Sequence, residues 1–138
     1  MAVGMSAATA DGVLSAVFQG TSFVVSALWV KLHVGDPGGA GTSNAAGETL
    51  RMNASACFGT APADDGSGMK EAIANTVAIG PWTSVTTAET YSHVSFWTAS
   101  SGGSFVGSGT LTSPTAVAIG DNFTVQIGDC VAKLSKAA

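Results

Sequence analysis

The sequence has few charged residues: five basic and nine acidic side chains among 138, or 10%, against about 25% in ordinary soluble domains. The formal net charge is −4 and no basic run occurs, which argues against nucleic acid as a partner. So few charges cannot build many ion pairs, and we expect contacts with other molecules to be apolar. Helix-favouring Glu, Lys and Arg are scarce beside Val, Thr, Ser and Gly, which favours an all-β domain.

Signals for secretion and for membrane insertion are also sparse. The first basic residue is Lys31, so the N-terminus lacks the positive region of a signal peptide. Residues 12–30 carry no charge, but they include a glutamine, serines and glycines, and we do not expect a membrane span there. The only two cysteines are Cys57 and Cys130, and without a secretion signal we expect two buried thiols rather than a disulfide.

No group of residues in the sequence is typical of an enzyme or of a cofactor site. His33 and His93 each stand in a predicted strand beside aromatic residues, with no third ligand at metal spacing, and we interpret both as structural. Asp64 and Asp65 lie in a glycine-rich segment without the closing glutamate of a calcium loop, which favours a solvated turn. No serine occupies a G-x-S-x-G elbow. The sequence therefore predicts no catalytic residue, no metal and no cofactor.

The clearest element is the segment 28–34, in which leucine and valine alternate with Trp29, Lys31 and His33. This period of two is typical of a strand with one buried face. The strand ends at a predicted structural turn formed by Gly35, Asp36, Pro37 and Gly38. Proline presets φ, aspartate can accept a backbone N–H two residues on, and glycine accepts positive φ.

Further strand patterns follow along the chain, separated by turn residues roughly every 8 to 12 positions. They cover residues 50–58, 70–79, 90–98, 104–111 and 117–134, the last interrupted at Gly120-Asp121-Asn122, with a turn predicted at Ser113-Pro114. The total is about seven or eight strands. Before the first strand, Asp11 is expected to cap a short helix that Gly20 ends, with Val13, Leu14, Val17 and Phe18 on one side. The pattern predicts an all-β antiparallel β-sandwich or jelly-roll-like domain over residues 11–138, with a short N-terminal helix and an arm over residues 1–10.

Aromatic residues on strand faces suggest how the chain meets its partners. Trp29, Tyr91 and Trp97 are predicted on the faces opposite the core, where a monomer would expose a large apolar surface. We therefore expect these three residues to form a subunit interface in a homo-oligomer, with a trimer favoured.

Several short motifs resemble those of a known family. The segment LHVGDP at residues 32–37, followed by Gly41-Thr42, is similar to the L-H-T-x-D-P-x-x-x-G-T signature of small virion proteins of tailed bacteriophages, usually labelled tail fibre or minor structural proteins. Further matches are, in order, ANT at 74–76 with Ile79 and Trp82, His93 and Phe96, Gly102-Gly103, GTLTSP at 109–114, and VAIGD at 117–121. The resemblance covers residues 28–134, with Val34 in place of the usual threonine.

The resemblance implies a non-enzymatic structural protein of a virion, made in the host cytoplasm. Our main expectation is a self-assembling decoration or cement subunit that docks on the major capsid protein. The alternative is a tail tip or tail fibre module that contacts the host and neighbouring tail proteins, and a second alternative is a glycan-binding or hydrolase domain. The absence of a long fibrous repeat and of a helical trimerisation segment favours the capsid.

Overall fold

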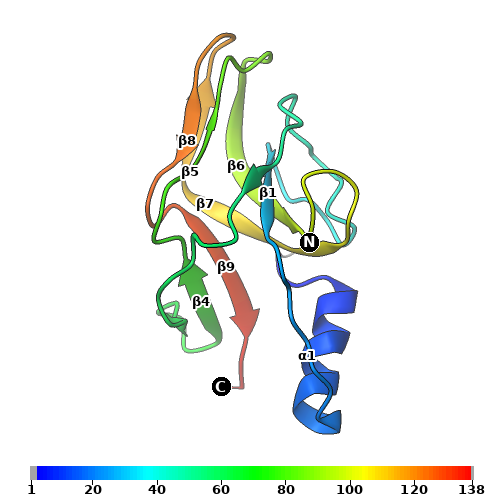
Figure 1. The fold of residues 1–138 in the computed structure, drawn as a ribbon. Helices are drawn as coiled ribbons and strands as arrows, with labels where there is room; N and C mark the ends of the chain where they lie inside the picture. Colours follow the sequence, from blue (N-terminus) through cyan, green and yellow to red (C-terminus); the bar gives the residue numbers. More distant parts are fainter. Residues whose placement is uncertain (1–2, 138) are drawn as a thin grey trace.

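The computed structural model describes residues 3–137, which form one helix and nine strands. In chain order these are α1 (Ala7–Gln19), β1 (Trp29–His33), β2 (Met52–Asn53), β3 (Ala63–Asp64), β4 (Lys70–Ala74), β5 (Ile79–Trp82), β6 (Glu89–Trp97), β7 (Phe105–Val117), β8 (Phe123–Val125) and β9 (Cys130–Ser135). Seven strands form an antiparallel sheet in the order β2-β1-β6-β7-β9-β4-β3, and β5 pairs with β8 in a second sheet. Figure 1 shows the β5–β8 ribbon near the upper end of the molecule and α1 at the lower end. The predicted antiparallel β-fold with one N-terminal helix is confirmed, although its second layer has only two strands.

The core is formed by side chains from both sheets. Val30 and Leu32 of β1 are fully buried, and they pair in register with Phe96 and Val94 of β6. Full burial of such a side chain stabilises the fold by about 1.5–3 kcal/mol. The small sheet contributes a second set of buried side chains, namely Ile79, Trp82, Phe123 and Val125. The alternating pattern that predicted the first strand is thus confirmed as β1, which lies between β2 and β6.

The strand β7 is longer than the sequence suggests, because Pro114 lies inside it. Between the pairs Tyr91–Thr115 and His93–Thr110, four residues of β7 stand opposite a single residue of β6. Proline has no N–H to give to a sheet ladder, so it is tolerated where the ladder is interrupted. The predicted turn at this proline is therefore wrong, and a wide bulge inside one strand takes its place.

The segment 70–79, which was expected to form one strand, is divided by Asn75. The buried amide of Asn75 donates to the carbonyls of Val77 and Gln126, each at 2.9 Å, and its Oδ1 accepts the N–H of Cys130 at 2.9 Å. These bonds hold a turn through which the chain leaves β4 in the large sheet and enters β5 in the small one.

The strand predicted over residues 50–58 is reduced to β2. After Asn53 the chain turns, because the side-chain Oδ1 of this asparagine accepts the N–H of Ser55 at 2.9 Å. The N–H of Cys57 then donates to the carbonyl of Ala54 at 3.0 Å. Local side-chain bonds of this kind compete with strand pairing.

The helix α1 begins five residues earlier than expected. Ser6, not Asp11, is the N-cap, and its Oγ accepts the N–H of Thr9 at 3.1 Å. Gly20 ends the helix in the left-handed conformation with φ 68°, as the sequence predicts. Part of the predicted arm is therefore helical.

The described part of the arm that precedes α1 is hydrogen-bonded to the large sheet. Met5 forms a bridge with Gly107, the N–H of Ser6 donates to the carbonyl of Val106 at 2.8 Å, and Ser108 donates its N–H to the carbonyl of Gly4 at 2.7 Å. Residues 1 and 2 of the arm lie outside the described residues. Residues 4–6 of the arm are thus attached to β7. Further along its length, β7 pairs with β9.

The two cysteines agree with the prediction of buried thiols. Cys57 and Cys130 are both free and buried, and burial raises the pKa of both, that of Cys130 to about 12. Among residues 3–137, no helix is both long enough and apolar enough to cross a membrane.

Candidate functional site

The predicted turn after β1 folds back on its own loop. The Oδ1 atom of Asp36 accepts the N–H of Gly38 at 2.8 Å, and Gly38 has the positive φ, 73°, that this turn requires. Pro37 is buried and its carbonyl accepts the N–H of Ser43 at 2.9 Å, while Asn44 donates its side-chain amide to the carbonyl of Asp36 at 2.9 Å. These contacts support the structural role that we predict for the turn.

His33 connects this loop to the centre of the sheet. Its ring is fully buried, with Nδ1 2.8 Å from the carbonyl oxygen of Ser43 and Nε2 2.8 Å from Oγ of Ser95. A carbonyl can only accept, so Nδ1 carries the proton and Nε2 accepts from the serine hydroxyl. The same hydroxyl accepts the indole N–H of Trp97 at 2.7 Å. Burial lowers the pKa of His33, which keeps the ring neutral and suits a structural residue better than a general base.

Two residues of the predicted interface, Trp29 and Trp97, pair with one another across β1 and β6 and are half-buried. Arg51 covers the indole ring of Trp97, with Cζ 4.1 Å from the ring centroid, and donates to two carbonyls of the β6–β7 loop at 2.9 and 2.7 Å. The ring of Phe105 lies beside it at 5.4 Å. The chain itself therefore covers much of Trp97, which leaves less of this face for a partner than we expected.

Tyr91, the third residue of the predicted interface, lies in the core. Its side chain is 0% exposed and its ring centroid is 4.9 Å from that of Phe123 in β8. Burial, with smaller contributions from Glu89 and Glu48, raises its pKa to about 12. The prediction placed Tyr91 on the strand face opposite the core. Because β8 packs onto it, Tyr91 cannot contact a partner, and we remove it from the candidate interface.

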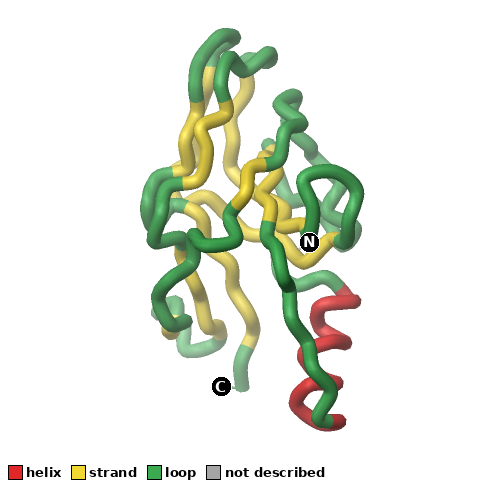
Figure 2. The backbone as a smooth tube through the Cα atoms, viewed as in Figure 1, coloured by secondary structure: helices red, strands yellow, loops and turns green. Residues whose placement is uncertain are grey.

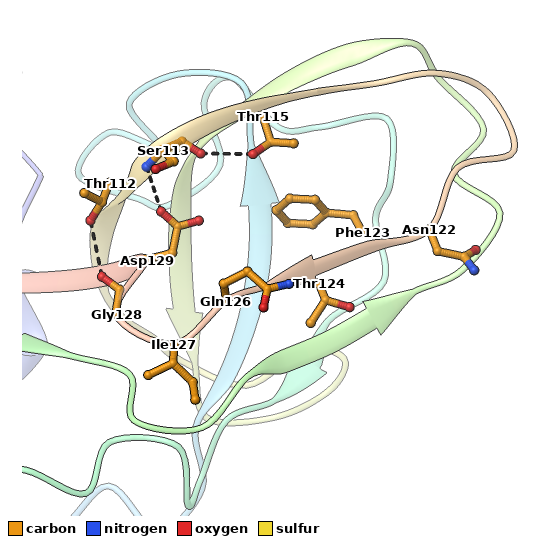
Figure 3. A pocket seen from close by; sticks show the side chains of 10 residues that line it. All are labelled: Thr112, Ser113, Thr115, Asn122, Phe123, Thr124, Gln126, Ile127, Gly128 and Asp129. Carbon is orange, nitrogen blue, oxygen red and sulfur yellow. Dashed lines mark hydrogen bonds between the residues drawn. The ribbon is translucent and has the colours of Figure 1, made fainter.

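An open pocket of about 510 Å³ lies between β7, β8 and the turn that leads to β9 (Figure 3). Its lining is rich in hydroxyl and amide groups and is formed by Thr112, Ser113, Thr115, Asn122, Phe123, Thr124, Gln126, Ile127, Gly128 and Asp129. Hydrogen bonds fix its wall, because Asp129 accepts the N–H of Ser113 at 2.7 Å and Thr112 donates to the carbonyl of Gly128 at 3.3 Å. The bulge that contains Pro114 creates this wall.

The chemistry of the pocket is that of hydrogen bonding rather than of catalysis. Asp129 is the single carboxylate in the lining, whereas glycoside hydrolysis ordinarily uses two facing carboxyl groups. No histidine, cysteine or lysine lines it. Among the described residues, no group of three or more His, Cys, Asp or Glu is placed to hold a metal ion. The pocket can offer donors and acceptors to a polar ligand such as a sugar.

Asp64 and Asp65, set aside as a calcium site in the sequence, form ion pairs with β9. Lys133 lies 2.9 Å from Asp65, and Lys136 bonds both Asp64 and Glu71. Hydrogen bonds from Ser67 and Lys133 lower the pKa of Asp65 well below its usual range. These ion pairs join the β3–β4 turn to the end of β9.

Exposed large apolar side chains gather on α1 and on the segment 20–28 that returns from it to β1. We call these two elements together the apolar hairpin; their backbones are shown in Figure 2. The most exposed of its large side chains are Phe18 at 80%, Val24 at 77%, Val17 at 68% and Leu14 at 55%. The side of α1 that faces the return segment carries small residues. At Gly12, an added Cβ would lie 2.3 Å from the ring of Phe23. The helix therefore packs its small side chains inward and presents its large apolar ones to solvent.

Comparison with known protein families places this chain among phage fibre proteins. The family described as podophage GP4 fiber I protein gp80 matches residues 4–133, which is nearly the whole chain. The chain belongs to this family. A search of curated protein sequences finds no match.

Membership of the gp80 fibre family confirms a structural role in the virion, and the family description names no enzymatic activity. It fits the tail-fibre alternative better than capsid decoration, which was our main expectation from the sequence. That expectation relied on the absence of a fibrous repeat. The reasoning was weak, because a fibre can also be built from short globular subunits that contact one another end to end.

Sequence reasoning missed both the pocket and the exposed side of the hairpin. Serines and threonines occur throughout the chain, so those of the pocket gave no local signal. The hairpin did give one, because residues 12–30 contain no charge. We considered this stretch only as a possible membrane span and did not consider it as an interface.

Proposed function

We propose that this chain is a globular structural subunit of a podophage tail fibre, without catalytic activity. The match of the gp80 fibre family to residues 4–133 carries the proposal. The geometry supports it, since the pocket between β7 and β8 lacks a pair of acid and base groups and both histidines are hydrogen-bonded to serines. The subunit would hold its shape through the buried core and present its loops to neighbouring tail proteins.

Copy number in the virion tests this proposal against capsid decoration. Quantitative mass spectrometry of purified virions, with a known tail protein and the major capsid protein as internal standards, should find copies in proportion to the tail. Antibody labelling should place the chain at the tail in electron micrographs. Hundreds of copies per virion, or label distributed over the capsid, would contradict a tail fibre.

The finer proposal is that the pocket between β7 and β8 faces the host. Its lining comes from β7, β8 and the turn before β9, and β8 lies away from α1 (Figure 1). Its exposed Gln126 and threonine hydroxyls suit hydrogen bonding to sugar hydroxyl groups. Gln126→Ala combined with Thr124→Ala should lower phage adsorption to host cells, whereas Thr42→Ala, at an exposed position outside the pocket, should not. Equal adsorption by wild type and the pocket variant would refute host contact at this surface while leaving the fibre location standing.

A further inference from the structure

The apolar hairpin is an exposed surface that nothing in the described chain covers. Six large apolar side chains of the hairpin, and that of Met5 just before α1, are more than a third exposed. The six are Val13, Leu14, Val17, Phe18, Phe23 and Val24. Together with Met5 they leave on the order of 700 Å² of apolar surface to solvent, close to the ~800 Å² that each partner contributes to a standard protein interface. Soluble monomers rarely expose apolar patches of more than a few hundred Å².

We propose that this hairpin is the self-association surface of the protein, and that its occupant is the hairpin of a second copy of this chain. The only charged residue within residues 7–28 is Asp11, in the first half of α1, so two copies can bring their hairpins together without charge repulsion along residues 12–28. The exposed apolar area of one hairpin is also large enough for a specific contact with the hairpin of another copy. The biological context of this self-association rests on the proposed fibre role, whereas the exposure and charge of the hairpin are independent of that role.

The hairpin is also held firmly enough to serve as an interface. Ser6 caps α1 at its start, and Thr9, in the first turn, is buried against the body of the chain. The ring of Phe23 packs on Gly12, which joins the return segment to the helix. Both ends of the hairpin continue into the large sheet, through the bridge between Met5 and β7 and through β1. Little conformational freedom is therefore left to be lost on association.

The exposed side of α1 is wide enough to contact two neighbouring copies. Val13, Leu14, Val17 and Phe18 point in directions that span about 140° around the helix axis, at about 100° per residue. A two-stranded seam buries a narrower stripe than this. Three copies around one axis would cover the whole arc, and we expect a closed trimer.

Sedimentation velocity of the full chain tests the proposal directly. At micromolar concentration we expect the mass of a trimer, and the same mass in 1 M NaCl, because salt screens ion pairs and leaves apolar association intact. The double variant Val17→Ser/Phe18→Ser should weaken association at least tenfold and sediment as a monomer. Ile119→Ser is the matched control, since Ile119 is 72% exposed between β7 and β8, outside the hairpin, and should leave association unchanged.

Cross-linking gives a second measurement that does not depend on weakening the protein. Val17→Cys should form covalent oligomers with a short bismaleimide, whereas Ile119→Cys should remain a single chain on a denaturing gel; the native cysteines are buried and contribute little. A wild-type monomer at 50 µM, or equal cross-linking at both positions, would overturn the proposal. Neither result would bear on the proposed tail location, which the copy number in virions tests. The two proposals can therefore fail independently of one another.

Discussion

Ser95→Ala tests whether the hydrogen-bonded group around His33 stabilises the fold. The serine hydroxyl is buried, donates to Nε2 of His33 at 2.8 Å and accepts the indole N–H of Trp97 at 2.7 Å. In the variant, the fully buried acceptor Nε2 of His33 and the half-buried indole N–H of Trp97 both lose their hydrogen bond to Ser95. An unsatisfied buried polar group costs about 1–3 kcal/mol, and the half-buried indole recovers part of its loss from water, so we expect destabilisation of ~2–3 kcal/mol.

Urea unfolding at fixed protein concentration measures this effect. With a slope of about 1–3 kcal/mol per molar urea, the midpoint should fall by about 0.7–3 M. Ser92→Ala is the matched control on the same strand: its hydroxyl lies 2.8 Å from Nδ1 of His93, but both residues are half-buried and water can replace the bond. The control should lose less than about 1 kcal/mol. Equal losses in the two variants would refute the reasoning.

The same histidine makes stability depend on pH in a defined direction. Burial lowers the pKa of His33 below its ordinary value of 6.5, so the unfolded chain takes up a proton at a higher pH than the folded chain does. Stability is therefore fully present above pH 6.5 and falls as the pH decreases below it. His33→Gln should flatten the melting temperature between pH 7 and pH 5. An unchanged slope in the variant would assign this pH dependence to other groups.

Three further changes probe other parts of the fold. Asp36→Ala removes the acceptor for an N–H two residues on and should cost about 1 kcal/mol in thermal unfolding without loss of assembly; unchanged melting with loss of a bound ligand would make the turn a binding site. Tyr91→Phe should be neutral or stabilising by up to ~1 kcal/mol, since within residues 3–137 no group hydrogen-bonds its buried hydroxyl; a clear loss would reveal a partner. Alkylation of the unfolded, unreduced chain should add two labels, at Cys57 and Cys130, and a linked peptide in place of them would contradict free thiols.

Local sequence pattern was sufficient for the elements whose structure is decided locally. Residues 28–34 alternate because Val30 and Leu32 on one face of β1 are buried in the core, and Gly20 ends α1 because only a residue that tolerates φ 68° fits there. The hairpin between β6 and β7 was likewise visible from Gly102-Gly103, both of which have positive φ. Each of these signals acts over a few residues.

The features that the sequence did not reveal depend on residues far apart in the chain. The interruption at Asn75 needs acceptors and donors from Gln126 and Cys130, more than fifty residues away. The burial of Tyr91 needs β8. The exposure of Phe18 could not be read either, because a run of apolar helical residues looks the same whether the rest of the chain covers it or leaves it to another molecule.

The attachment of the apolar hairpin has a mechanical consequence. Its return segment runs almost in line with β1 (Figure 1), and its other end is bonded to β7 through residues 4–6. A pull on α1 along this line would act along β1, whose hydrogen bonds to β6 run perpendicular to the strand. All of those bonds would be loaded in shear at once instead of opening one after another. Tension applied at the hairpin would therefore enter the body of the chain through the β1–β6 pair, whose hydrogen bonds resist it together.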